Sequence, residues 1–186
     1  MRPHLPLPLL SALLACFISP SWAAYTLTGN GETTISFADD QYTITPPAGD
    51  PVTQADSPGD IYLTDITESG TYEDGYNRVL NLKGGIYTKL QLWNVAGTAG
   101  GVTLGGTNSF VINIGAGTSL LNTNPQLMGW SNQDRIVAAD ITLNVDQNAG
   151  TINGFCLVGD GNKTDAFQTT GTYIVNIHGG EWAGTS

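Results

Sequence analysis

The feature that most constrains this chain is an asparagine that returns after about 32 residues within a run of alternating aliphatic side chains. The four copies occupy residues 79–82, 111–114, 142–145 and 174–177, and their asparagines are Asn81, Asn113, Asn144 and Asn176. The interval between successive asparagines varies by no more than a single position. A fixed period of this length is typical of repeat architectures in which each unit packs only against its neighbours. The repeat therefore predicts a solenoid.

Alternation within each copy assigns the two faces of a predicted strand. The residues flanking the asparagines are the pairs Leu80/Leu82, Ile112/Ile114, Leu143/Val145 and Val175/Ile177. Successive side chains of a strand point to opposite faces, so these pairs should face the core while the asparagines face outward. In a parallel solenoid, equivalent residues stack about 4.8 Å apart. We therefore expect the asparagines to form a hydrogen-bonded amide ladder.

The expected fold class is all-β, a right-handed parallel β-helix with coils of about 32 residues. Two weaker repeats predict two more short strands in each coil. Leu90, Leu120 and Ile152 follow their asparagines at a short and nearly equal interval, and Leu104, Ile136 and Phe167 follow theirs at a longer, constant interval. Helices should be nearly absent, because the chain lacks a sustained apolar period of the helical kind. An antiparallel sandwich or meander is the competing architecture, but it does not require one residue type to return at the same strand position.

Composition excludes several classes of protein. Charged residues make up 12% of the chain, about half the usual share, which is too few to coat the outer faces of a helical bundle. The formal net charge of −10 repels phosphate, so no nucleic-acid partner is expected. The 4 Trp, 7 Tyr and 5 Phe argue against disorder.

Residues 1–23 have the parts of a secretory signal peptide: Arg2, an apolar run over 9–18, and small residues at 21 and 23 that predict cleavage after Ala23. The run is too short to span a bilayer, and no transmembrane segment is expected elsewhere. Cys16 ends a Leu-Leu-Ala-Cys sequence that resembles a lipobox, which leaves a lipoprotein as the minor alternative. Cleavage after Ala23 would leave Cys156 as the only cysteine, so no internal disulfide is expected.

These observations divide the chain into three regions. Residues 1–23 are the expected signal peptide, 24–77 an N-terminal cap with the opening coil, and 78–186 the β-helix repeats. Terminal repeats of solenoids are atypical because they cap an open core. The fourth copy reaches Ser186 without a recognisable cap, so we expect an N-terminal fragment whose missing C-terminal part belongs to the same polypeptide.

The last copy, YIVNIHGGEWAGTS over 173–186, resembles the aliphatic-Asn-Ile-x-Gly-Gly-x-aromatic-x-Gly units of large bacterial surface proteins, and 110–117 and 79–85 are looser copies. With its signal peptide, low cysteine content and Asn/Thr/Gly composition, the chain is similar to autotransporter passenger and adhesin-like proteins of Gram-negative bacteria. The resemblance covers roughly 78–186. It implies a parallel β-helix displayed outside the cell or on the outer-membrane surface, with host or surface glycans or proteins as partners. A translocator barrel beyond Ser186 and secretion by another route both stay open.

Some polysaccharide lyases and hydrolases are also parallel β-helices, so outward-facing residues must be considered as catalytic candidates. One such row lies two positions after each asparagine. Its members are Lys83, Gly115, Asp146 and His178. Asp146 and His178 should lie on adjacent coils, where a carboxylate and an imidazole can form an acid/base pair. We favour a solvated contact, because His178 is the only histidine of the mature chain and no second carboxylate joins the pair. We therefore expect no catalytic residue and no enzyme. A polysaccharide-processing β-helix enzyme and a carbohydrate-binding module are the alternative functions.

Two further motifs carry weaker predictions. The segment from Asp160 to Asp165 partly resembles a calcium loop, but it lacks the sixth-position glycine and a twelfth-position acid. A polar turn is preferred, so no metal or other cofactor is expected. Exposed aromatic rings can bind sugars, and the candidates are Tyr87, Trp93, Trp130 and Trp182. They do not recur in register, which leaves a repeated sugar-binding column unsupported. The sequence thus predicts an exported β-helical scaffold without catalytic activity.

Overall fold

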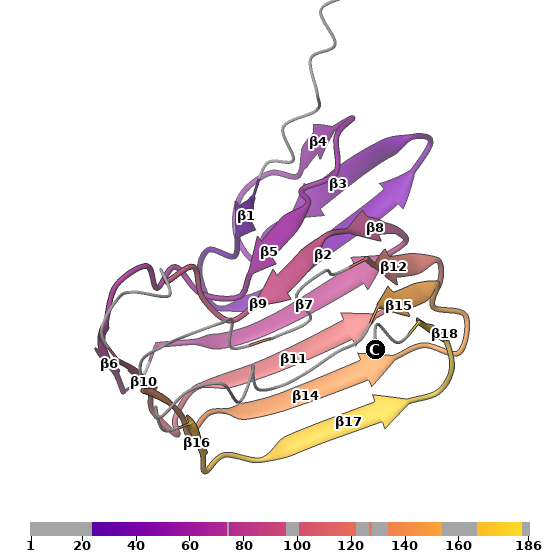
Figure 1. The fold of residues 1–186 in the computed structure, drawn as a ribbon. Helices are drawn as coiled ribbons and strands as arrows, with labels where there is room; N and C mark the ends of the chain where they lie inside the picture. Colours follow the sequence, from indigo (N-terminus) through magenta and orange to yellow (C-terminus); the bar gives the residue numbers. More distant parts are fainter. Residues whose placement is uncertain are drawn as a thin grey trace, which may run out of the picture.

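The chain winds through about four turns of a parallel β-solenoid, with roughly 32 residues in each turn (Figure 1). The computed structural model describes residues 24–73, 75–95, 101–121, 127, 134–153 and 167–183, and these residues form strands and turns but no helix. The predicted all-β fold class is therefore confirmed. The expected signal peptide 1–23 with Cys16, together with Trp130, Cys156 and the segment from Asp160 to Asp165, lies outside the described residues.

The largest sheet holds the asparagine repeats. Its parallel strands are β2 (Gly31–Ala38), β7 (Asn77–Lys83), β11 (Ser109–Ile114), β14 (Asp140–Val145) and β17 (Tyr173–Ile177). Two antiparallel strands, β3 (Gln41–Thr45) and β4 (Val52–Gln54), extend it beyond β2. The hairpin from β2 to β3 turns at Asp39 and Asp40, whose φ angles of 51° and 58° give the mirror-image turn that suits the twist of paired strands.

Three smaller parallel sheets form the other sides of the solenoid. One contains β8 (Gly85–Tyr87), β12 (Thr118–Leu120), β15 (Thr151–Asn153) and β18 (Glu181–Ala183). The next contains β6 (Gly70–Tyr72), β10 (Val102–Leu104), β13 (Arg135–Val137) and β16 (Phe167–Thr169). The last contains β1 (Tyr25–Thr26), β5 (Asp60–Tyr62) and β9 (Lys89–Gln91), which belong to the first coils.

The prediction that Leu90 is equivalent to Leu120 and Ile152 is wrong. Leu90 pairs with Ile61 in the sheet of β9, whereas Tyr87 of β8 pairs with Leu120, which pairs in turn with Ile152. The coil that contains Asn81 has two short strands, β8 and β9, after that asparagine. Because counting from the asparagine cannot distinguish two neighbouring strands, it selected the second one.

The repeat formed by Leu104, Ile136 and Phe167 identified the right strands in the wrong register. Leu104 pairs with Val137 rather than with Ile136, and Phe167 pairs with Arg135. The connection from the asparagine to this strand lengthens from coil to coil, because β10 begins at Val102, β13 at Arg135 and β16 at Phe167, which are 21, 22 and 23 residues after Asn81, Asn113 and Asn144. A constant number of residues from the asparagine therefore does not give the register of these strands, because the connections differ in length.

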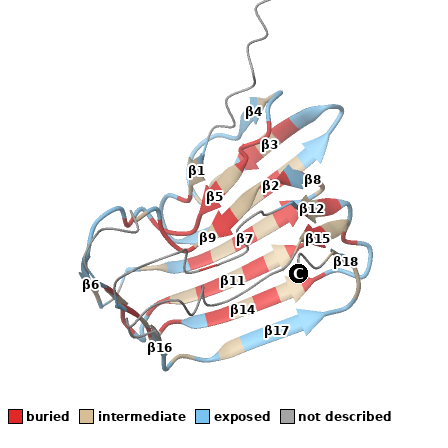
Figure 2. Ribbon diagram, viewed as in Figure 1, coloured by how far each residue is buried: buried red, intermediate tan, exposed pale blue. Residues whose placement is uncertain are grey.

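The inward-facing aliphatic columns form the core, as predicted for the first three copies. Leu80, Leu82, Ile112, Ile114, Leu143 and Val145 are each at most 1% exposed. In β17 the equivalent residues Val175 and Ile177 are 45% and 53% exposed, because no described strand pairs beyond β17 (Figure 2). Burial of apolar surface between successive coils is therefore what holds the stack together.

Glycine is required where a corner of one coil lies against the previous coil. A Cβ atom on Gly115 would lie 2.7 Å from the carbonyl oxygen of Leu82. The Gly115 amide donates a 2.8 Å hydrogen bond to that same oxygen. The close contact and the bond both depend on a residue without a side chain.

Candidate functional site

The asparagines lie in one column, as the sequence predicts. Asn81, Asn113, Asn144 and Asn176 are paired in register on neighbouring parallel strands. Each amide donates through Nδ2 to Oδ1 of the asparagine on the preceding coil, over 2.7 Å for Asn113, 2.7 Å for Asn144 and 2.8 Å for Asn176. Every bond of the ladder has the same direction. The outer face of the largest sheet thus uses its polar side chains to join coil to coil.

The ladder begins at a carboxylate on the first strand of the sheet. Asn81 Nδ2 donates to Glu32 Oε1 over 2.7 Å and lies 3.4 Å from Thr34 Oγ1. A carboxylate can only accept hydrogen bonds, so it suits a ladder whose first member must donate. Glu32 gives no signal in the sequence, because β2 lacks an asparagine at this position.

The predicted pair Asp146 and His178 lies beside the ladder, where the structure has a shallow groove of about 230 Å³. The groove is lined by Asn113, Ile114, Gly115, Asn144, Val145, Asp146 and His178. Asp146 Oδ1 accepts a 2.7 Å hydrogen bond from the backbone amide of Asn148, which organises the turn after β14. The backbone amide of His178 donates to the Val145 carbonyl over 3.0 Å. These contacts give Asp146 a turn-forming role.

Among the described residues, the aromatic candidates for sugar binding are not gathered on one surface. Tyr87 and Trp93 are buried, at 0% and 2% exposure, and belong to the core. Trp182 is 40% exposed and donates from its indole nitrogen to the Gly179 carbonyl over 3.1 Å. The described candidates therefore place one exposed ring on the surface.

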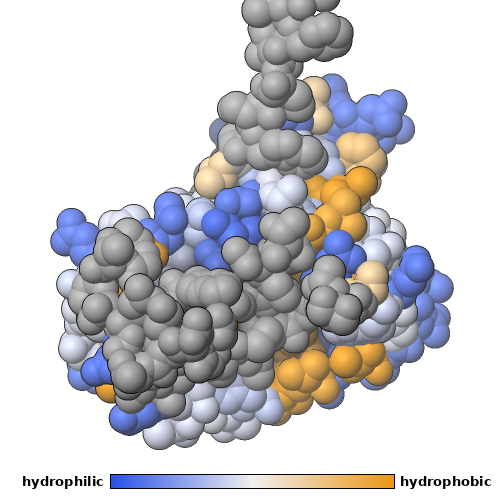
Figure 3. Space-filling model, in the orientation of Figure 1, coloured by the Kyte–Doolittle hydropathy of each residue, from blue (hydrophilic) through white to orange (hydrophobic). Residues whose placement is uncertain are grey.

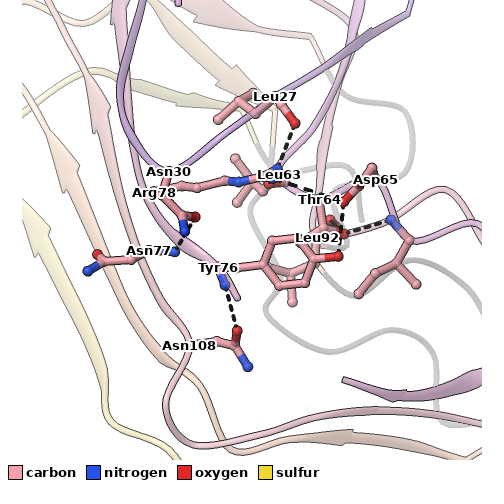
Figure 4. A network of polar contacts seen from close by, with 11 residues as sticks. Leu27, Asn30, Leu63, Thr64, Asp65, Tyr76, Asn77, Arg78, Leu92 and Asn108 are labelled. Atoms are coloured by element: carbon pink, nitrogen blue, oxygen red, sulfur yellow. Dashed lines mark hydrogen bonds and ion pairs between the residues drawn. The ribbon is translucent and has the colours of Figure 1, made fainter. Parts of the chain in front are cut away.

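A buried arginine ties the first two coils together (Figure 4). Arg78 occupies a core position of β7, in register with the buried Phe110, and is only 6% exposed. Its Nη1 donates 2.6 Å hydrogen bonds to the carbonyl oxygens of Leu27 and Leu63. Leu27 follows β1 and Leu63 follows β5, so one guanidinium joins both to β7. Burial lowers the pKa of Arg78 from its usual value.

Tyr76 covers the guanidinium of Arg78, whose Cζ lies 4.7 Å from the ring centroid. The Tyr76 hydroxyl donates to Asp65 Oδ1 over 2.9 Å. Burial, followed by the hydrogen bond and the charge of Asp65, raises the pKa of Tyr76 to about 12. The Tyr76 amide donates to Asn108 Oδ1 over 2.9 Å, which extends the network to the next coil (Figure 4). The network thus joins β7 to the segments after β1 and β5 and to the corner before β11.

A second hollow lies on the N-terminal part of the molecule and was missed by the sequence analysis. This cap pocket has a volume of about 280 Å³ and is lined by Phe37, Asp40, Tyr42, Ala55, Asp56, Ser57 and Ile86. Phe37 and Ile86 are 37% and 44% exposed, and Figure 3 shows apolar surface over β3 and β8 below the hydrophilic hairpin tip. The lining residues come from β2, β3, the turn between them, β8 and the segment after β4. No local sequence motif therefore predicts the pocket.

The floor of the cap pocket is fixed by hydrogen bonds to Ile86. The Tyr42 hydroxyl accepts from the Ile86 amide over 3.0 Å, and Ser57 Oγ donates to the Ile86 carbonyl over 2.6 Å. These bonds occupy the backbone groups at the outer edge of β8. A Cβ atom on Gly85 would come within 2.6 Å of the Tyr42 ring, so glycine at 85 lets the ring lie against β8.

A scan against protein-family models and searches of curated proteins and of solved structures each found no match to this chain. Among the described residues, no group of three or more His, Cys, Asp or Glu is arranged to hold a metal ion. None of the described segments is a helix long and apolar enough to cross a membrane.

Proposed function

We propose that this chain is a β-helical scaffold of an exported protein displayed on the surface of a Gram-negative bacterium, of the autotransporter passenger or adhesin type. The single observation that carries the proposal is the unbroken amide ladder from Glu32 to Asn176. The polar groups on the outer face of the largest sheet are engaged in joining coils, which suits an elongated spacer.

The surface chemistry supports the same role. A formal net charge of −10 favours a soluble surface that resists self-association. The predicted signal peptide and the resemblance of 173–186 to surface-protein repeats supply the expected location. Host or surface glycans or proteins are the proposed partners of the displayed molecule, and catalysis is not part of the proposal.

Export is tested by intact mass and fractionation of the chain in a Gram-negative host. We expect cleavage after Ala23, and a Ser21→Lys/Ala23→Lys variant should stay uncleaved because signal peptidase needs small residues there. The Cys16→Ser variant should be processed like the wild type. Loss of membrane association in this variant would instead support the lipoprotein alternative, and an uncleaved wild-type chain in the cytoplasm would overturn export.

Display is tested separately in the cells that produce the protein. Antibodies raised against residues 24–183 should label intact cells, and external protease should remove the label. Labelling that needs permeabilised cells would contradict surface display. Purified chain applied to an array of glycans and to host cells then tests adhesion, while release of reducing ends or unsaturated sugars from polysaccharides would favour the enzyme alternative.

A further inference from the structure

We propose that the cap pocket binds a lysine or arginine side chain of a basic polypeptide. The pocket combines an apolar wall with two carboxylates: Phe37 and Ile86 are partly exposed apolar residues, and Asp40 and Asp56 line the same hollow. Long basic side chains carry an aliphatic stem that packs on apolar surface and a charged end that stays beside polar groups. The pocket offers a partner for each part, and an aromatic ring such as that of Phe37 also attracts a cation.

The charge of the surrounding region selects a cation. Residues 24–73 contain nine Asp or Glu and no Lys or Arg, and the nearby exposed Lys83, paired in register with Ser36, is not among the lining residues of the pocket. Of the neighbouring acids, Asp60 pairs with Lys89 over 3.0 Å and Asp65 accepts from Tyr76. Asp40 and Asp56 are exposed and lie at the pocket. Their field attracts basic partners and disfavours anionic ones.

The hydrogen bonds made by Ile86 disfavour another form of recognition on the β8 side of the pocket. An extended peptide often adds to the free edge of a sheet through main-chain hydrogen bonds. At β8 these positions are taken, because Tyr42 and Ser57 already bond the amide and the carbonyl of Ile86. A partner is therefore expected to bind through an inserted side chain. This inference stands apart from the proposed display role, which depends on export rather than on this pocket.

The experiment is an NMR titration of the uniformly labelled chain with Nα-acetyl-lysine methylamide. The matched probe is Nα-acetyl-norleucine methylamide, which keeps the stem and lacks the ammonium group. We expect the lysine probe to shift the amide signals of Phe37 and Ile86. The norleucine probe should bind roughly three- to tenfold more weakly, as expected for partly exposed ion pairs to two carboxylates.

Variants separate the pocket from the overall charge. Asp40→Asn combined with Asp56→Asn should weaken lysine binding by a similar factor, and asparagine tolerates the positive φ of residue 40. Asp50→Asn is the control, since Asp50 is an exposed acid of the same region that does not line the pocket. Unchanged amide dispersion in all variants shows that they fold.

Four outcomes would overturn the proposal. The first two are the absence of amide shifts at Phe37 and Ile86 with the lysine probe, and equal affinity for the lysine and norleucine probes. The third is an equal loss of lysine affinity in Asp50→Asn and in the double variant. The fourth is binding of a methyl glycoside at Phe37 and Ile86 without binding of the lysine probe. Failure of surface display would leave all four readouts unaffected.

Discussion

The side-chain amide of Asn81 donates a 2.7 Å hydrogen bond to the carboxylate of Glu32, which lies on the neighbouring strand of the same sheet. This contact fixes the direction of the column that follows. Each asparagine donates to the coil before it and offers its own oxygen to the coil after it. The ladder is therefore a directed chain of hydrogen bonds, and its members can be tested one at a time.

Replacement of Asn113 by Asp should destabilise the middle of the ladder. The new carboxylate can accept from Asn144 but cannot donate to Asn81, so two oxygens face each other across the coils. We expect the free energy of unfolding at pH 7 to fall by about 1–3 kcal/mol, the cost of a polar group that loses its partner. Urea denaturation followed by circular dichroism measures the change. Asn94→Asp is the control, because Asn94 is exposed in the turn after β9.

The same variant should show a characteristic pH dependence. Only the protonated carboxyl group can donate to Asn81, so folding should raise its pKa above the value of about 3.9 found in unfolded chains. Its stabilising contribution is then fully present below pH ~4 and is lost as the pH rises through the folded-state pKa. The stability gap to the wild type should narrow in acid. A gap that stays constant between pH 3 and pH 7 would count against the bond direction assigned here.

Arg78→Met should destabilise the junction of the first coils. Methionine fills a core position that is apolar in the next coil, but it leaves the carbonyls of Leu27 and Leu63 without the guanidinium. We expect a loss of about 1–3 kcal/mol in the free energy of unfolding, measured by urea denaturation. Lys83→Met is the control, since it removes a positive charge from an exposed position of the same strand. An unchanged stability for Arg78→Met would mean that the desolvation of the guanidinium outweighs its two bonds.

Alkaline pH should weaken the fold through Tyr76. A tyrosine whose pKa is raised by folding contributes stability that is present below the unfolded value of 10 and is lost as the pH rises toward the folded value of about 12. Tyr76→Phe should therefore lose less stability than the wild type between pH 9 and pH 11.5, although it starts lower because the bond to Asp65 is gone. Denaturation curves at fixed ionic strength across this range provide the measurement, and parallel pH profiles would contradict it.

Lysines at Val175 and Ile177 should reduce self-association. These residues of β17 are about half exposed, and Ile174 on the opposite face is 46% exposed, so both faces of the strand carry exposed apolar side chains. Exposed apolar strands are preferred sites of intermolecular pairing, and lysine opposes it. Light scattering should show less aggregate for Val175→Lys/Ile177→Lys. Gln168→Lys/Thr170→Lys adds the same charge on exposed positions of the neighbouring β16 region and should have little effect.

The parts of the fold that depend on strict repetition could be predicted from the sequence. Alternation around Asn81, Asn113 and Asn144 specified strands, faces and register together, since a strand shifted by one residue reverses its faces. The positions of Leu90 and Ile136 could not be predicted in register. They depend on how many residues each corner uses, and corners differ in length without changing the strands that they join.

The candidate site was less predictable for a different physical reason. Phe37, Tyr42 and Ile86 are ordinary strand residues, and their meeting requires the antiparallel hairpin to fold over the edge of β8. Arg78 likewise gives no signal of its own until its register with Phe110 places it in the core. Such features arise from contacts between segments far apart in the chain, such as Tyr42 with Ile86 and Arg78 with Leu27. The ladder arises instead from a period that is visible in the sequence.

The uniform direction of the amide ladder has an evolutionary consequence. A duplication of the codons for one repeat would insert one coil that brings its own donor and its own acceptor. The inserted asparagine would donate a hydrogen bond to the asparagine of the coil before it and accept one from the asparagine of the coil after it. Both ends of the column would stay chemically unchanged. Gene length can thus change in steps of whole coils, and natural selection can adjust the reach of the molecule without redesigning the junctions between its parts.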